Sequence, residues 1–164
     1  MINKQILFLF FLFFSCDIVD NKILIQNVNV IDPIDGLKKN INVEILDNKI
    51  IYVGNIKKSN SYSKEIDGTG KYLIPGLWDN HVHFYFDQEL AKDMPDLFLK
   101  FGITSVRDTG GNFKFLDSIK ALSKENPKTF PRVKISGPLI DGKFNVYNGE
   151  RLPDLSVKTR NVQE

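Results

Sequence analysis

The segment that begins at Tyr72 alternates short β-rich runs with helical stretches, and this alternation restricts the fold more than any other feature of the sequence. Strands are expected near 72–83, 103–108 and 131–136, and helices over 88–101 and 113–124. Gly102 stands where the first helix should end. Strands that alternate with helices pack as parallel βαβ units. The second half of the chain is therefore predicted to be an α/β domain.

Two helical patterns carry more specific expectations. The first helix takes its apolar positions from four residues and is interrupted by Pro95; the four are Leu90, Leu97, Leu99 and Phe101. The polar stretch 156–164 is expected to form the opening turns of a further helix.

The residues before Tyr72 have the texture of short strands joined by tight turns. Isoleucine and valine are frequent over 23–30, and apolar residues alternate with polar ones over 41–45, as in a half-buried strand. Asp47-Asn48 is a turn signal, and the strand expected at 49–53 completes a β-hairpin. A polar loop follows at 57–63. Residues 17–72 are thus predicted to form a small antiparallel β module.

The first sixteen residues read as an export signal. Lys4 precedes an unbroken apolar run over 6–14, which is too short to span a bilayer but has the length of a signal-peptide core. Ser15-Cys16 follows and resembles the lipobox of bacterial lipoproteins, in which the cysteine is lipidated. An ordinary secretory signal and an uncleaved anchor are the alternatives. The chain is expected to be exported, either anchored to a membrane through Cys16 on the periplasmic or cell-surface side, or secreted.

Composition narrows the class of protein. Hydrophobic residues make up 42% of the 164 residues and charged residues 26%, a globular balance. Cys16 is the single cysteine, so an intrachain disulfide is excluded. The net charge is only +2, and no basic run is interleaved with aromatics. Nucleic acid is therefore not an expected partner.

The two histidines of the chain, His81 and His83, stand together at the end of the first strand expected in the α/β domain. Side chains alternate along a strand, so residues 77, 79, 81 and 83 should share one face and both imidazoles can converge on one metal ion. Asp79, on the same face, could then orient one imidazole by accepting a hydrogen bond from the ring N–H that does not face the metal. A histidine in a strand is more often structural, and an H-x-H motif by itself is weak.

Three stretches, in order, resemble the amidohydrolase superfamily. The first, 73–83, reads LIPGLWDNHVH and is similar to the first barrel strand of that family. The second, 101–111, reads FGITSVRDTGG, and the third, 131–138, reads PRVKISGP. Within that superfamily, the three stretches most resemble those of imidazolonepropionase-like and Xaa-Pro-dipeptidase-like members. Residues 22–72 look like the β module that precedes the barrel.

This resemblance implies a (β/α)8 barrel and a metal-dependent hydrolase of C–N bonds in a small-molecule amide or dipeptide. His81 and His83 would be the first two ligands of a divalent metal, most often zinc, which activates water. In the family, a carboxylated lysine or glutamate, two more histidines and an aspartate complete the site from later strands.

The sequence departs from that pattern after its third strand. About 90 residues follow Leu73, whereas such a barrel needs at least ~200. Residues 73–164 are therefore expected to form roughly three βα units of an incomplete TIM-like barrel. We expect a truncated part of an enzyme that is inactive by itself. A non-catalytic lipoprotein or binding remnant that kept the β module, and a pseudogene product without a stable fold, are the alternatives.

Other polar and aromatic residues near the histidines receive structural interpretations. Arg107 and Asp108 are adjacent and should point to opposite faces, so one is expected to be a polar residue of the barrel interior and the other a packing or loop residue. The glycines of 110–111 are expected to form a turn rather than an anion cradle. Trp78, Phe84 and Phe86 are expected to pack in the core or at the barrel rim.

Overall fold

The computed structural model describes residues 21–55, 61–142, 152 and 155–159. The chain divides into two compact units, the first ending at Ile74 and the second beginning at Pro75. The expected export signal and Cys16 lie outside the described residues. Within the part of the chain that is described, no helix is long and apolar enough to cross a membrane.

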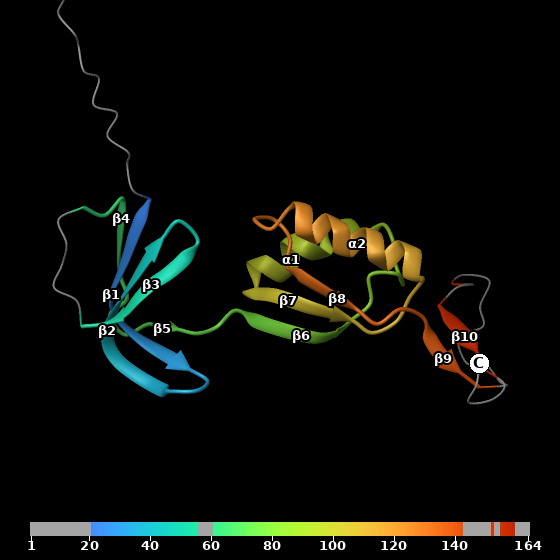
Figure 1. The fold of residues 1–164 in the computed structure, drawn as a ribbon, viewed down its shortest axis with the longest axis horizontal. Helices are drawn as coiled ribbons and strands as arrows, with labels where there is room; N and C mark the ends of the chain where they lie inside the picture. Colours follow the sequence, from blue (N-terminus) through green and yellow to red (C-terminus); the bar gives the residue numbers. More distant parts are fainter. Residues whose placement is uncertain (1–20, 56–60, 143–151, 153–154, 160–164) are drawn as a thin grey trace, which may run out of the picture. The chain divides into compact units, whose positions relative to one another are not determined.

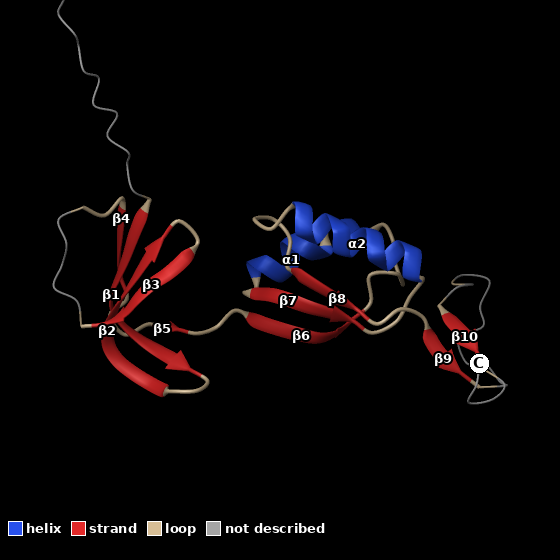
Figure 2. Ribbon diagram, in the orientation of Figure 1, coloured by secondary structure: helices blue, strands red, loops and turns tan. Residues whose placement is uncertain are grey.

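The first unit is a five-stranded sheet (Figures 1 and 2). Its strands are β1 (Lys22–Asp32), β2 (Gly36–Leu46), β3 (Lys49–Gly54), β4 (Lys64–Asp67) and β5 (Tyr72–Leu73). The first three form the expected antiparallel meander, in which Leu46 pairs with Lys49 across a two-residue turn. Asp47 adopts a φ of 54° in that turn, as a tight hairpin requires. The sequence therefore predicted this hairpin correctly.

Strands β4 and β5 add to the sheet in a way that the sequence did not reveal. Both pair with β1, and both run parallel to it. The module is thus a mixed sheet: β1–β3 are antiparallel, and β4 and β5 are parallel to β1. Four buried side chains from β1 and β2 form its core: Leu24, Val28, Ile41 and Val43.

A buried charge sits beside this small core. Glu44 is 7% exposed, and its carboxylate accepts a hydrogen bond from the hydroxyl of Tyr62. Lys22 forms a salt bridge to the same carboxylate at 3.1 Å and lies 5.2 Å from the centre of the Tyr62 ring. The Tyr62 hydrogen bond, followed by Lys22, holds the pKa of Glu44 below its usual value. These contacts offset the cost of burying the charge.

The second unit is built on three parallel strands, β6 (Leu77–Val82), β7 (Ile103–Asp108) and β8 (Arg132–Ile135), in that order. The connections are α1 (Met94–Lys100), preceded by a short 3-10 turn at Leu90–Lys92, and α2 (Phe113–Glu125). Both helices lie on the same side of the sheet (Figure 1). The α/β class predicted from the sequence is confirmed, and β6 and β8 form the two edges of the sheet.

The core of the second unit lies between this sheet and its helices. Its largest fully buried member is Phe84, whose ring meets Phe98 of α1 edge to face at 6.1 Å. Leu116 and Ile119 enter from α2, whereas Leu122, which the helical spacing placed on one stripe with Ile119, is exposed. The other buried members come from the three strands and from the segments that follow or connect them: Val82, Tyr85, Ala91, Val106, Val133 and Leu155.

The first helix is shorter than the expected 88–101. Pro95 occupies the first turn of α1 rather than interrupting it, because a proline there gives up no helical hydrogen bond. Leu90, Leu97 and Phe101 are exposed, so the apolar positions assigned to this helix are mostly wrong. Gly102 does end the helix, with the left-handed φ of 77° that favours glycine.

The end of the described chain differs from the expectation. The helix expected over 156–164 is absent where the structure describes it, since Ser156–Lys158 is a strand, β10. It pairs in parallel with β9, Leu139–Asp141, which the sequence did not predict. Residues 160–164 lie outside the described part. In β10 an apolar residue, Val157, stands between two polar ones, and this alternation fits a strand better than a helix.

Candidate metal site

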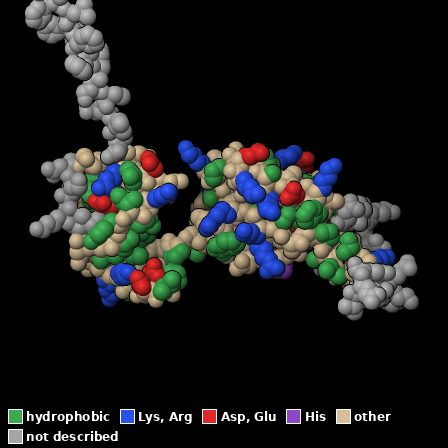
Figure 3. Space-filling model, in the orientation of Figure 1, with side chains coloured by type: hydrophobic (Ala, Val, Ile, Leu, Met, Phe, Trp, Pro, Cys, Tyr) green, Lys and Arg blue, Asp and Glu red, His purple; other side chains and the backbone are tan. Residues whose placement is uncertain are grey.

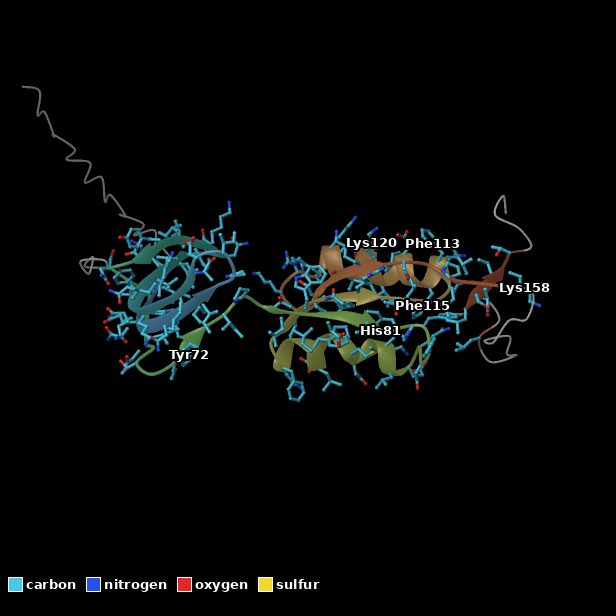
Figure 4. All side chains as sticks on the ribbon, turned by 90° about the horizontal axis from the view of Figure 1, so that it is seen from below. Tyr72, His81, Phe113, Phe115, Lys120 and Lys158 are labelled. Atoms are coloured by element: carbon cyan, nitrogen blue, oxygen red, sulfur yellow. The ribbon has the colours of Figure 1, made fainter. Side chains whose placement is uncertain are left out.

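The two histidines meet at the carboxyl end of β6, where Figure 4 labels His81. The Nε2 atoms of His81 and His83 lie 3.2 Å apart, and the two ring centres are 5.2 Å apart. His81 is exposed and His83 is partly buried. A histidine side chain also reaches the surface in the space-filling view, next to Lys and Arg side chains (Figure 3). The rings therefore present two nitrogen atoms to the same point in space.

This separation fits a shared metal ion. Imidazole nitrogen binds zinc at ~2.0–2.1 Å, and two nitrogen atoms 3.2 Å apart then subtend an angle of about 100–106° at the ion. That angle is close to tetrahedral. The donor chemistry and the spacing thus both fit a divalent metal.

Three neighbours fix the ring of His83. Its Nδ1 lies 3.2 Å from the carbonyl oxygen of Gly110. Phe86 stacks on the ring at a centroid distance of 4.1 Å and an interplanar angle of 2°. The hydroxyl of Thr109 is 3.5 Å from Nε2. Because the Nδ1 edge faces a carbonyl, the Nε2 edge is the one turned toward His81.

A bulge in β6 lies between Asp79 and Val82 and changes how Asp79 meets the histidines. Asp79 pairs with Val106, and Val82 pairs with Asp108, so three steps along β6 match two along β7. One extra residue reverses the alternation of side chains, which places Asp79 on the face of Val82. The expectation that Asp79 shares a face with His81 is therefore wrong. Its carboxylate accepts a hydrogen bond from the backbone N–H of His81 at 3.0 Å and not from the ring.

Asp108, at the end of β7, is the residue that the sequence interpretation undervalued. It is fully buried, and its two carboxylate oxygens accept the backbone N–H groups of Phe84 at 2.7 Å and Gly110 at 2.9 Å. Burial raises the pKa of Asp108, against the opposite effects of these two amides and of His83. An aspartate directly before a Thr-Gly-Gly turn is the signal that could have indicated this role.

The two glycines after Asp108 are required by close packing. A Cβ on Gly110 would lie 2.7 Å from Cδ2 of Leu139, and one on Gly111 would lie 2.6 Å from Cβ of Tyr85. The Gly111 N–H donates to the carbonyl of Gly137 at 3.2 Å. This stretch is a turn, as expected, and it joins the carboxyl ends of β6, β7 and β8.

The remaining residues singled out in the sequence do not reach the histidine pair. Phe84 is in the core, and Trp78 is 45% exposed with the Arg132 guanidinium 5.7 Å from its ring. Arg107 and Lys134 are register partners on β7 and β8, and both are exposed. Among the described residues, no group of three or more His, Cys, Asp or Glu side chains could hold a metal ion. Two ligands are thus what this part of the chain brings together.

No family model matches the chain. Among curated proteins it is 47% identical over 62 residues to the dihydroorotase of Clostridioides difficile, a match that covers 38% of this chain and 15% of that protein. It is 34% identical over 88 residues to the adenine deaminase of Clostridium perfringens, covering 52% of this chain and 15% of that protein. The chain therefore spans about 15% of the length of the curated relatives that it matches.

Solved structures extend the likeness to most of the chain. A Xaa-Pro dipeptidase with bound methionine in the active site superimposes with a TM-score of 0.62 at 26% identity, over 74% of this chain and 34% of that one. A putative prolidase from Bifidobacterium longum gives a TM-score of 0.64 at 20% identity, over 85% of this chain and 35% of that one. The arrangement of a β module followed by parallel βα units is thus shared with much longer chains.

Proposed function

We propose a function from one premise: this chain is a relative of the amidohydrolase superfamily, similar to the Xaa-Pro dipeptidases, and it spans an N-terminal part of that fold. In our proposal it supplies the first two metal ligands, His81 and His83, to a hydrolase that acts on C–N bonds. The observation that carries this proposal is the convergence of the two Nε2 atoms at 3.2 Å. The names of the relatives, dihydroorotase, adenine deaminase and Xaa-Pro dipeptidase, all denote reactions at such bonds.

A divalent metal ion, for which we favour zinc, would supply a bound water of lowered pKa and would polarise the carbonyl of a small amide or dipeptide substrate. The contribution of this chain is to hold two imidazoles. His83 is held from one edge by Gly110 and across its face by Phe86. His81 projects from the end of β6, where the bulge directs it. The Nε2 atoms of the two rings face each other at 3.2 Å.

We further propose that the chain alone has no hydrolase activity. A catalytic zinc site typically keeps three protein ligands and a water molecule, and the described residues bring two ligands together. Complete longer relatives would provide the rest from later strands. Measured metal-dependent hydrolysis of an amide or dipeptide by the purified chain would contradict this part of the proposal.

Zinc titration of the purified full chain, followed by calorimetry, tests the central claim. The wild type should bind one Zn²⁺ per chain, and both His81→Ala and His83→Ala should lose this binding. Asn80→Ala is the matched control, because Asn80 is an exposed residue of the same strand and directly precedes His81 in the sequence. The absence of zinc binding by the wild type, or its retention in both histidine variants, would overturn the proposal.

Export and anchoring through Cys16 are part of the proposal as well. The basis is the sequence, in which an apolar run ends at Ser15-Cys16. Mass spectrometry of the chain produced in a bacterium should reveal a lipid-modified N-terminal peptide that begins at Cys16, and Cys16→Ser should abolish it. An unmodified Cys16 in the membrane fraction would contradict lipidation.

A further inference from the structure

We propose that Asp108 is a positioning residue for His83. It fixes the turn whose carbonyl oxygen selects the Nδ1–H tautomer of that histidine, and it thereby keeps Nε2 free for a metal ion. This inference rests on the proposed function only for its use of the metal. The tautomer itself is a property of the metal-free chain.

The first step is the anchoring of the turn. Both oxygens of Asp108 are used, one by the N–H of Phe84 and the other by the N–H of Gly110, and the side chain is fully buried. The carboxylate therefore joins the residue that follows His83 to the turn that follows β7. Neither amide can exchange this partner for water without opening the core.

The second step runs from the turn to the histidine. The peptide group between Gly110 and Gly111 is held at its N–H, which donates to the carbonyl of Gly137 at 3.2 Å. The preceding peptide group is held by Asp108 at 2.9 Å. With both peptide groups fixed, the Gly110 carbonyl oxygen points at Nδ1 of His83, 3.2 Å away. The orientation of this carbonyl thus depends on Asp108.

The third step is the choice of tautomer. A carbonyl oxygen can only accept a hydrogen bond, so Nδ1 must carry the proton. In a neutral imidazole the lone pair then lies on Nε2. Two potential donors face that atom, the hydroxyl of Thr109 at 3.5 Å and Nε2 of His81 at 3.2 Å. Because each of these groups can donate or accept, the Nε2 edge permits this tautomer, and the Gly110 carbonyl selects it.

Nitrogen-15 NMR of the full chain with labelled histidine tests this proposal. The chain has two histidines, so His81→Gln assigns both imidazoles. In metal-free wild type at alkaline pH, His83 should carry its proton on Nδ1. Asp108→Asn keeps the shape but presents one amide with an NH₂ group, and His83 should then populate both tautomers. The affinity for Zn²⁺ should fall by about 10–100-fold, as for other partners of metal ligands.

Ser123→Ala is the structural control. It removes a buried hydrogen bond of 2.7 Å, from Ser123 Oγ to the carbonyl of Pro131, at the opposite end of β8. This variant should leave the His83 tautomer and the zinc affinity unchanged. An equal change of tautomer in Ser123→Ala, or none in Asp108→Asn, would overturn the positioning role.

The wild type alone keeps the test decisive if Asp108→Asn does not fold. A wild-type His83 that carries its proton on Nε2 refutes the proposal without any variant. A wild-type His83 protonated on Nδ1 in a chain that binds no Zn²⁺ supports the tautomer selected by the Gly110 carbonyl and overturns the proposed function. The two ideas therefore fail on different measurements.

Discussion

Replacing Gly111 by alanine probes the packing beneath the histidine pair. The added Cβ would lie 2.6 Å from Cβ of Tyr85 and 3.2 Å from Cδ1 of Leu116. Both neighbours are buried, and the Cβ of Tyr85 cannot rotate away because it is bonded directly to the backbone. The backbone itself must therefore shift. Overpacking of this kind costs about 1–3 kcal/mol.

That cost converts into a measurable change in melting temperature. For a unit the size of Pro75–Glu164, 1 kcal/mol shifts the midpoint by about 4–8 °C, so Gly111→Ala should lower it by about 4–24 °C. Thermal melting of the full chain, followed by circular dichroism, gives the value. Gly142→Ala is the matched control, since no atom of the described residues lies within 4 Å of its added Cβ. An unchanged midpoint in Gly111→Ala, or an equal loss in Gly142→Ala, would refute the packing argument.

Three further changes test other parts of the molecule. Because Tyr62 holds the pKa of Glu44 below its ordinary 4.5, the carboxylate stabilises the fold above that pH, and this contribution is lost as the pH falls through the lowered pKa. Glu44→Gln should therefore flatten the acid side of a plot of melting temperature against pH, and identical slopes would count against the buried cluster. Lys134→Glu places an opposite charge beside Arg107 and should stabilise the chain by about 0.2–1 kcal/mol in urea unfolding; a gain that does not shrink with added salt would contradict an electrostatic cause. Phe84→Ala should cost about 3–5 kcal/mol in the same measurement, and a loss below 1 kcal/mol would show that Phe84 is not a core residue.

The features that the sequence predicted well are those set by local pattern. The hairpin turn at Asp47 and the helix stop at Gly102 follow from backbone conformations that these residues adopt readily. The helix over 113–124 was also predicted to within a residue, because Phe115, Ile119 and Leu122 repeat at helical spacing, although Leu122 is exposed. Such signals need only a few neighbouring residues.

The features that were missed depend on pairing between distant segments. The strand β9, Leu139–Asp141, has three residues and exists because Ser156–Lys158 pairs with it. The bulge in β6 is visible only once its register against β7 is known, and it changes the face of the strand on which Asp79 lies relative to His81. The role of Asp108 depends likewise on Phe84, 24 residues earlier in the chain. Sequence spacing locates the histidine pair but not the contacts that orient it.

The two unpaired edges of the three-stranded sheet have a practical consequence for anyone who handles this chain. Each of β6 and β8 pairs on one side only among the described residues, which leaves a row of backbone donors and acceptors on the other side. Unpaired backbone groups of this kind can form hydrogen bonds with a strand of another molecule. Recovery of the purified chain should therefore be limited by concentration, through association of folded molecules along these edges, more than by the free energy of unfolding of a single molecule.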